Sequence, residues 1–252
     1  MKKLFNKVAV ITGASRGIGR AISLLFSENG CNLILISRDD EKALREVEDE
    51  CKKFNITTLA LSGDISDKNF CKLAAIRSVE KFEHIDILIN SAGVIARSSF
   101  DNMEYADWEG VIDINLNGTM QVIKEFLPYL DHSEQYNKKI VTITSQMAYL
   151  PHPGANPSYE VSKSGLVALS RHLAFKNAKK NININCIAPG SINTDMPKSM
   201  PEEIRERLRR SIPMQRLGEP IEVAKLALFL SSDDSDYITG TTCHINGGSL
   251  MI

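Results

Sequence analysis

Short apolar runs alternate along this chain with longer segments of helical composition. The runs are mostly continuous in apolar character, which is typical of strands that are covered on both faces. We therefore expect strands at Val8–Thr12, Asn32–Ile36, Thr57–Leu61, Ile85–Asn90, Lys139–Thr144, Asn183–Ile187 and Thr241–Ile245.

The segments between these runs predict helices of two kinds. Asp40–Phe54 and Asp67–Phe82 are charged and amphipathic, as in helices with one exposed face. Ser162–Lys176 is more apolar all round, which indicates burial or a subunit contact. The alternation of strand and helix predicts an α/β fold, a Rossmann-type doubly wound sheet of about seven parallel strands with helices on both faces.

The chain contains no Gly/Ser/Pro-rich linker that would divide it, so we expect a single dinucleotide-binding and catalytic domain over residues 1–252. An irregular stretch from Pro189 to about Pro201 leads into a strongly charged segment, Pro201–Arg210. The acids of that segment precede its arginines, as the helix dipole prefers. We interpret residues at about 190–215 as a substrate lid that carries a surface helix.

Composition and charge exclude several classes of function. The net charge of −1 leaves no broad basic field for nucleic acid or anionic lipid. The N-terminal apolar run is too short for a secretion signal, and no stretch approaches the roughly 18 apolar residues of a membrane helix. The five cysteines form no C-x-x-C pair and the histidines have no metal-ligand spacing. We expect a cytoplasmic protein with reduced thiols, no metal, and neither a membrane nor a nucleic acid as partner.

A glycine-rich turn follows the first predicted strand and opens a helical segment. Its glycines allow a sharp turn and a close approach of the backbone to a pyrophosphate, while the first N–H groups of the helix face the anion. A purely structural glycine turn is the alternative interpretation. The candidate cofactor-binding residues of this turn are Gly13, Ser15, Arg16, Gly17, Ile18 and Gly19.

Three side chains form a candidate catalytic site. Tyr159 and Lys163 are four residues apart, so on a helix they share one face. A free tyrosine has a pKa near ~10, and a neighbouring ammonium lowers that pKa by stabilising the phenolate. In the reductive direction the same tyrosine protonates a carbonyl oxygen as hydride arrives. Ser145 follows the strand at Lys139–Thr144, where its hydroxyl can polarise the substrate oxygen.

Together these residues resemble the classical short-chain dehydrogenase/reductase family over nearly the whole chain. The resemblance implies a nicotinamide-dependent oxidoreductase in which Asn115 completes a proton relay with the three residues above. It implies that Tyr159 and Lys163 also contact the cofactor. Ser91 departs from the family's N-N-A-G turn. The further cofactor contacts that the resemblance implies are Asp64 and Ile65 for adenine, Asn90, Ala92 and Gly93 in the N-N-A-G turn, and Pro189, Gly190, Ile192 and Thr194 for the nicotinamide.

Within the family, the C-terminal third is most similar to bacterial 3-oxoacyl-(acyl-carrier-protein) reductases of fatty acid biosynthesis. The matching stretches begin at Thr194, Arg216 and Tyr237. This resemblance implies an acyl-thioester carbonyl substrate and a possible acyl carrier protein partner. Phe175 stands where those reductases place an arginine for the carrier. A sugar, polyol or small-ketone dehydrogenase is the first alternative, and a non-catalytic cofactor-sensing protein is the second.

The end of the second strand predicts NADP(H) rather than NAD(H). NAD-specific proteins place an acid there to bind the ribose hydroxyls, whereas this chain has Ser37 and Arg38. Together with Arg16 they can enclose a 2′-phosphate. The rival ribose ligands, Asp39 and Asp40, are typical of a cap for the next helix.

Two predicted helices carry apolar residues on more than one face, Trp108–Leu127 and Ser162–Lys176. Large apolar surfaces of this kind usually mark subunit interfaces. With the family resemblance, this predicts a homotetramer with two-fold symmetric contacts.

Overall fold

All seven predicted strands form one parallel sheet in the computed structural model, which describes residues 2–38, 40–130, 137–151, 156–194 and 202–252. The strand order is β3-β2-β1-β4-β5-β6-β7, so the order reverses between β1 and β4 and the prediction of a doubly wound sheet is confirmed. The strands are β1 Val8–Thr12, β2 Asn32–Ser37, β3 Thr58–Ser62, β4 Ile87–Asn90, β5 Lys138–Ile143, β6 Ile182–Pro189 and β7 Thr242–Ile245.

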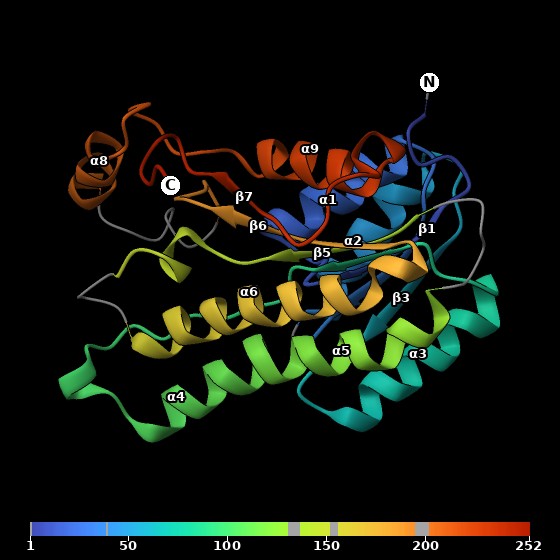
Figure 1. Ribbon diagram of the computed structural model, residues 1–252, viewed down its shortest axis with the longest axis horizontal. Coiled ribbons are helices and arrows are strands. Elements are labelled where there is room, and N and C mark those ends of the chain that lie inside the picture. Colours follow the sequence, from blue (N-terminus) through green and yellow to red (C-terminus); the bar gives the residue numbers. More distant parts are fainter. Residues whose placement is uncertain (1, 39, 131–136, 152–155, 195–201) are drawn as a thin grey trace.

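Helices cover both faces of the sheet (Figure 1). One layer contains α1, α2 and α9, and the opposite layer contains α3, α4, α5 and α6. Among the described residues, no helix is both long and apolar enough to cross a membrane. The helix bounds are α1 Gly17–Glu28, α2 Glu41–Lys52, α3 Lys68–Phe82, α4 Tyr105–Ile112, α5 Thr119–Phe126, α6 Pro157–Asn177, α8 Glu202–Ser211 and α9 Pro220–Ser231.

The two layers explain why the strand sequences are apolar at successive positions. Along β1, Ala9 and Ile11 pack into the core beneath α1, α2 and α9, whereas Val8 and Val10 pack into the core beneath α3 and α5. Side chains of a strand alternate between the faces of the sheet, so a strand that is buried on both faces is apolar at most of its positions.

The helix expected at Trp108–Leu127 is interrupted. A π-helical segment, Asp113–Gly118, joins α4 to α5. Such wide turns are rare and are found frequently at functional sites, and this one contains Asn115. A Cβ at Gly118 would lie 2.9 Å from Ile65 Cγ1, so the segment packs closely against the residues that follow β3.

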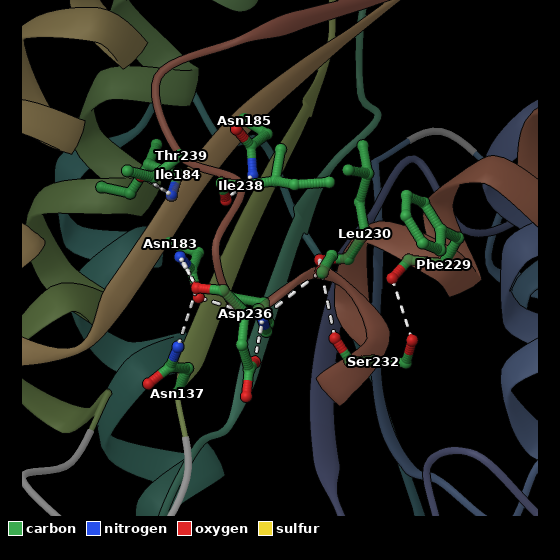
Figure 2. Close-up of polar contacts among 12 residues, drawn as sticks. Asn137, Asn183, Ile184, Asn185, Phe229, Leu230, Ser232, Asp236, Ile238 and Thr239 are labelled. Carbon is green, nitrogen blue, oxygen red and sulfur yellow. Dashed lines mark hydrogen bonds and ion pairs between the residues drawn. The ribbon is translucent and has the colours of Figure 1, made fainter.

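The connection from α9 to β7 is tied to β6 by side-chain amides (Figure 2). Asn183 Nδ2 donates to the carbonyl oxygen of Asp236 at 3.0 Å, and Asn185 Nδ2 donates to that of Ile238 at 2.8 Å. These bonds satisfy backbone carbonyls of an irregular segment and hold it against the sheet. They thereby position β7, the last strand of the chain, which pairs with the carboxyl-terminal residues of β6.

Candidate active site

The four predicted catalytic residues lie together at the carboxyl end of the sheet. Ser145 follows β5, Tyr159 and Lys163 lie in the first turns of α6, and Asn115 lies in the π-helical segment. A Cβ at Gly93 would be 3.3 Å from Asn115 Oδ1 and 3.4 Å from Lys163 Nζ. The turn after β4 therefore lies close to both side chains, and a Cβ at Gly93 would fit only tightly between them.

Asn115 is completely buried and its side-chain amide is fully engaged. Its Oδ1 accepts from the backbone N–H of Val94 at 2.8 Å, and its Nδ2 donates to the carbonyl oxygen of Val94 at 2.9 Å. The same Nδ2 also donates to Ser162 Oγ at 3.2 Å. Asn115 thus joins the turn after β4 to the helix that carries Tyr159 and Lys163, while a part in proton relay stays a prediction.

Burial controls the ionisation of the catalytic pair. Loss of solvent raises the pKa of Tyr159, and a hydrogen bond with Ser145 opposes that rise. Loss of solvent also lowers the pKa of Lys163 to about 8. Lys163 Nζ donates to the carbonyl oxygen of Ile143 at 2.9 Å and lies 5.6 Å from the centre of the Tyr159 ring.

The expectation that Lys163 and the oxidised cofactor lower the pKa of Tyr159 stays a prediction, and burial of the phenol opposes that lowering. In the structure the ammonium bonds to a backbone carbonyl, whereas the phenol is paired with Ser145. Ser145 Oγ already accepts from the N–H of Met147 at 3.1 Å, so its own proton is available to donate. The arrangement holds Tyr159 as a neutral phenol, which is the form that can donate a proton.

The glycine turn has the geometry of a backbone cradle. Gly13 and Gly17 have positive φ angles of 68° and 57°, and a Cβ at Gly19 would lie only 2.1 Å from the carbonyl oxygen of Gly13. Arg16 is the N-cap of α1 and makes no side-chain hydrogen bond to the helix start among the described residues. Ile18 lies in the first turn and is partly buried. The helix N–H groups are therefore available to a phosphate.

The residues predicted to bind the adenosine end lie close together. Ser15 Oγ and Ser37 Oγ are 2.8 Å apart, and Arg38 Nη1 lies 3.3 Å from Asp64 Oδ2. Both side chains of that ion pair remain partly exposed, with 39% of Arg38 and 34% of Asp64 accessible. Ile65 is buried next to them. This end of the site combines two hydroxyls with a guanidinium that is paired with a carboxylate.

The rival ribose ligand Asp40 does not lie free at the strand end. Its side chain caps α2 by accepting from the N–H of Ala43 at 2.8 Å, as expected of a helix cap. Asp39 lies outside the described residues.

At the carboxyl end of β4, Asn90 is buried and donates through Nδ2 to Thr142 Oγ1 at 3.3 Å. Its Oδ1 is buried without a hydrogen-bond partner among the described residues, as expected of an atom that awaits a ligand. Thr12 Oγ1 accepts from the N–H groups of Ser91 and Ala92, both at 3.1 Å. Sequence analysis missed this role of Thr12, although a polar residue at the end of a buried strand was the available signal.

The predicted nicotinamide segment continues from the end of β6. Pro189 is the last residue of β6, and Gly190 N–H donates to the carbonyl oxygen of Ile245 at 2.9 Å. Ile192 pairs with Gly218, and Thr194 Cγ2 lies 3.4 Å from the Cβ position of Gly17. The segment after β6 therefore lies against the phosphate turn, although the two are far apart in sequence.

Asn156 is a second residue that sequence analysis missed. It is completely buried and caps α6, where its Oδ1 accepts from the N–H of Ser158 at 3.0 Å and its Nδ2 donates to Ser98 Oγ at 2.9 Å. It thus fixes the start of the helix that presents Tyr159. Its position directly before Pro157 was the available signal, because proline favours the first position of a helix.

Comparison with known proteins agrees with this geometry. A family model described as "Enoyl-(Acyl carrier protein) reductase" matches residues 13–249. The 3-oxoacyl-[acyl-carrier-protein] reductase of Thermotoga maritima is 36% identical over 252 residues, which cover 99% of this chain and all of the relative. "Oxidoreductase UcpA" of Salmonella typhimurium is 36% identical over 259 residues, covering 100% of this chain and 97% of the relative.

A solved structure shows the same arrangement. A short-chain dehydrogenase from Burkholderia cenocepacia in complex with NADP superimposes with a TM-score of 0.92 at 26% identity, covering 98% of this chain and 99% of that chain.

Proposed function

This chain belongs to the short-chain dehydrogenase/reductase family, and from that premise we propose that it transfers hydride between NADP(H) and a carbonyl or secondary alcohol. The observation that carries the proposal is the buried cluster of Ser145, Tyr159, Lys163 and Asn115 at the carboxyl end of the sheet. A protein that only senses a cofactor has no need of all four side chains. Their assembly therefore favours catalysis over the cofactor-sensing alternative.

Ser145, Tyr159 and Lys163 each have a separate role in the proposed reduction. NADPH, when bound, supplies the hydride. Ser145 donates a hydrogen bond to the carbonyl oxygen and polarises it, and Tyr159 transfers its phenolic proton to that oxygen. Lys163, with its hydrogen bond to Ile143, holds a positive charge next to the phenolate that remains. Burial of the site excludes water, which strengthens each of these interactions.

The fit of the site to NADP(H) rests on its two ends. The cradle of Gly13 and Gly19 leaves no room for side chains beside the pyrophosphate, and the unpartnered Oδ1 of Asn90 lies at the carboxyl end of β4, next to β1. Ser37 and Arg38 supply a hydroxyl and a guanidinium for a 2′-phosphate. The NADP-bound structural neighbour and the reductases among the relatives support the same cofactor.

For the substrate we propose a 3-oxoacyl thioester, as in the reductases that this chain resembles, in the cytoplasm and with acyl carrier protein as a possible partner. Lys176, Lys179 and Lys180 keep one end of α6 basic, which suits an acidic carrier. Phe175, however, is 91% exposed at the position where we expected an arginine. This observation favours the alternative of a small ketone, sugar or polyol.

A spectrophotometric screen tests the proposal. Purified protein should oxidise NADPH in the presence of 3-oxoacyl thioesters, β-ketoesters, ketones and sugars, with the highest kcat/KM on the 3-oxoacyl thioesters. Tyr159→Phe should abolish turnover but bind NADPH as wild type does, because only the phenolic oxygen donates the proton. Tyr149→Phe is a matched control, since its hydroxyl bonds to Thr242 on β7 and not to the catalytic residues. Wild-type turnover in Tyr159→Phe would contradict the mechanism.

We also propose a homotetramer. Tyr105 and Met120, from the helices before and after the π-helical segment, are exposed by 83% and 38%, and Val161 on α6 by 46%. Subunit contacts would cover these apolar side chains. Light scattering at micromolar concentration should give a tetramer, and a stable monomer would contradict the proposal.

A further inference from the structure

A cavity lined by three arginines lies between α8 and the segments that follow β6 and precede α9. Its volume is about 260 Å³. Figure 1 places α8 at one end of the molecule, beyond the carboxyl ends of β6 and β7. The described residues that line the cavity are Asn193, Arg205, Arg209, Arg216, Leu217 and Glu219.

The lining contributes three guanidinium groups and one carboxylate, and each guanidinium also contacts a glutamate outside the lining. Arg205 and Arg209 lie one turn apart on α8 and present the same face of the helix. Arg216 comes from the opposite wall, where Glu222 holds it with two hydrogen bonds of 2.7 Å. Asn193 Nδ2 donates to Glu219 Oε1 at 3.0 Å, which engages the one acid of the lining.

Among the described residues, the acids that pair with Arg205 and Arg209 of α8 are exposed. Glu202 contacts both Arg205 and Arg209 but is 67% exposed, and Glu206 is 43% exposed. Exposed ion pairs of this kind contribute little stability and exchange readily for another anion. Arg209 Nε lies 3.1 Å from Glu206 Oε2 without being aligned to donate to it, so this buried N–H has no hydrogen-bond acceptor among the described residues.

We propose that this cavity binds an oxyanion, a carboxylate or a phosphate group. Guanidinium groups bind such groups through two parallel charge-assisted hydrogen bonds, and the unused Nε of Arg209 is a donor of that type. The anion is held from both sides, by Arg205 and Arg209 on α8 and by Arg216 on the opposite wall. It therefore fastens α8 to the rest of the domain.

The position of Asn193 connects this site to the proposed reaction. Asn193 lies between Ile192 and Thr194, which we assign to the nicotinamide, so an anion in the cavity also steadies the cofactor segment. The anion is either carried by the substrate or free in solution. A substrate-borne anion would make the enzyme a reductase of oxo acids or phosphorylated carbonyl compounds, and this arm of the inference rests on the proposed function.

Pairs of substrates that differ only in a negative charge test whether the bound anion is part of the substrate. Oxo acids should be reduced with a kcat/KM at least about tenfold above that of their methyl esters, because the ester cannot form the charged bonds. Arg209→Ala and Arg205→Ala should remove that preference by lowering kcat/KM for the oxo acids towards the value for the esters. Arg210→Ala is the matched control, since Arg210 lies on α8 and pairs with Glu206 but is 78% exposed and does not line the cavity.

Inorganic phosphate tests whether the cavity binds an anion that is free in solution, and this measurement does not require turnover. At equal ionic strength, phosphate should raise the melting temperature of wild type and of Arg210→Ala above the value in chloride, but not that of Arg209→Ala.

The proposal is supported if the preference for oxo acids over esters, or the rise in melting temperature with phosphate, depends on Arg209. The first result would show that the anion is part of the substrate, and the second that it is free in solution. If neither occurs, or if Arg210→Ala has the same effect as Arg209→Ala, the proposal is overturned. A chain that oxidises no NADPH would refute the proposed function, while the phosphate measurement would still report on the cavity.

Discussion

Substitution of Gly17 or Gly19 in the phosphate turn should impair the protein, but for a different physical reason at each position. Gly19 lies in the first turn of α1, and the Cβ of an alanine there would stand 2.1 Å from the carbonyl oxygen of Gly13, where ordinary contact begins at 3.4 Å. At Gly17 an alanine has room, since its closest neighbour is Thr194 Cγ2 at 3.4 Å. The obstacle at Gly17 is its φ of 57°, which L-residues other than asparagine rarely adopt.

The magnitudes follow from these two geometries. Gly17→Ala should cost about 1–2 kcal/mol through its left-handed backbone, and Gly17→Asn should recover part of that loss. Gly19→Ala must displace the backbone of Gly13, which cannot move freely because its own Cβ position is 2.9 Å from the backbone of Ala92. Overpacking without room to relax costs about 1–3 kcal/mol or more. If that strain falls on the phosphate cradle, NADPH should bind about 10- to 100-fold more weakly, since each 1.4 kcal/mol is about tenfold.

Two measurements separate these effects. Fluorescence titration with NADPH gives the dissociation constant, and thermal unfolding at equal protein concentration gives the stability, where 1 kcal/mol shifts Tm by roughly 2–4 °C in a chain of this size. Gly19→Ala should lose more cofactor affinity than Gly17→Ala, and Gly17→Asn should melt above Gly17→Ala. The reasoning is refuted if Gly19→Ala binds NADPH within twofold of wild type.

Further predictions concern charge. Ser37→Asp combined with Arg38→Ala should shift the kcat/KM preference from NADPH towards NADH, and an unchanged preference in steady-state kinetics would show that these residues do not bind the phosphate. Reduction should slow as pH rises through about 8, because Lys163 then loses its charge; a pH–rate profile that is flat there would contradict this role. Burial lowers the pKa of Lys163 from 10.5 to about 8 in the folded protein. The cost of burying its charge therefore reduces the free energy of unfolding in full below about pH 8, and this cost shrinks as the pH rises towards 10.5. The buried Lys138 ammonium lies 2.6 Å from the Asp86 carboxylate. Asp86→Ala leaves this ammonium without its partner and should lower the free energy of unfolding, measured in urea, by about 3–5 kcal/mol. A decrease below about 1 kcal/mol would show that the ion pair contributes little to stability.

Strands were predictable here because burial on both faces leaves a local signature, a run of apolar residues. The interior of β6 breaks that signature, since Asn183 and Asn185 alternate with isoleucine. Their purpose is visible only in three dimensions, where they bind carbonyl groups more than fifty positions further along the chain. Likewise, Lys138 and Lys139 begin β5 as an apparently exposed basic pair, yet both are buried, and each meets a distant aspartate.

The same distinction applies to the candidate site. Residues that face a ligand belong to short motifs, so Ser145, Tyr159 and Lys163 could be predicted without a structure. Their supports could not, because the bond of Asn115 to Val94 and the pair of Arg38 with Asp64 join segments that only the folded sheet brings together. The π-helical turn is the clearest case, since sequence analysis expected an uninterrupted helix over Trp108–Leu127 and no motif marked the wider turn at Asp113–Gly118. Motifs therefore predict which atoms react, whereas the ionisation of those atoms depends on burial and on partners that no motif contains. The rise in the pKa of Tyr159, for example, comes from its burial in the folded protein.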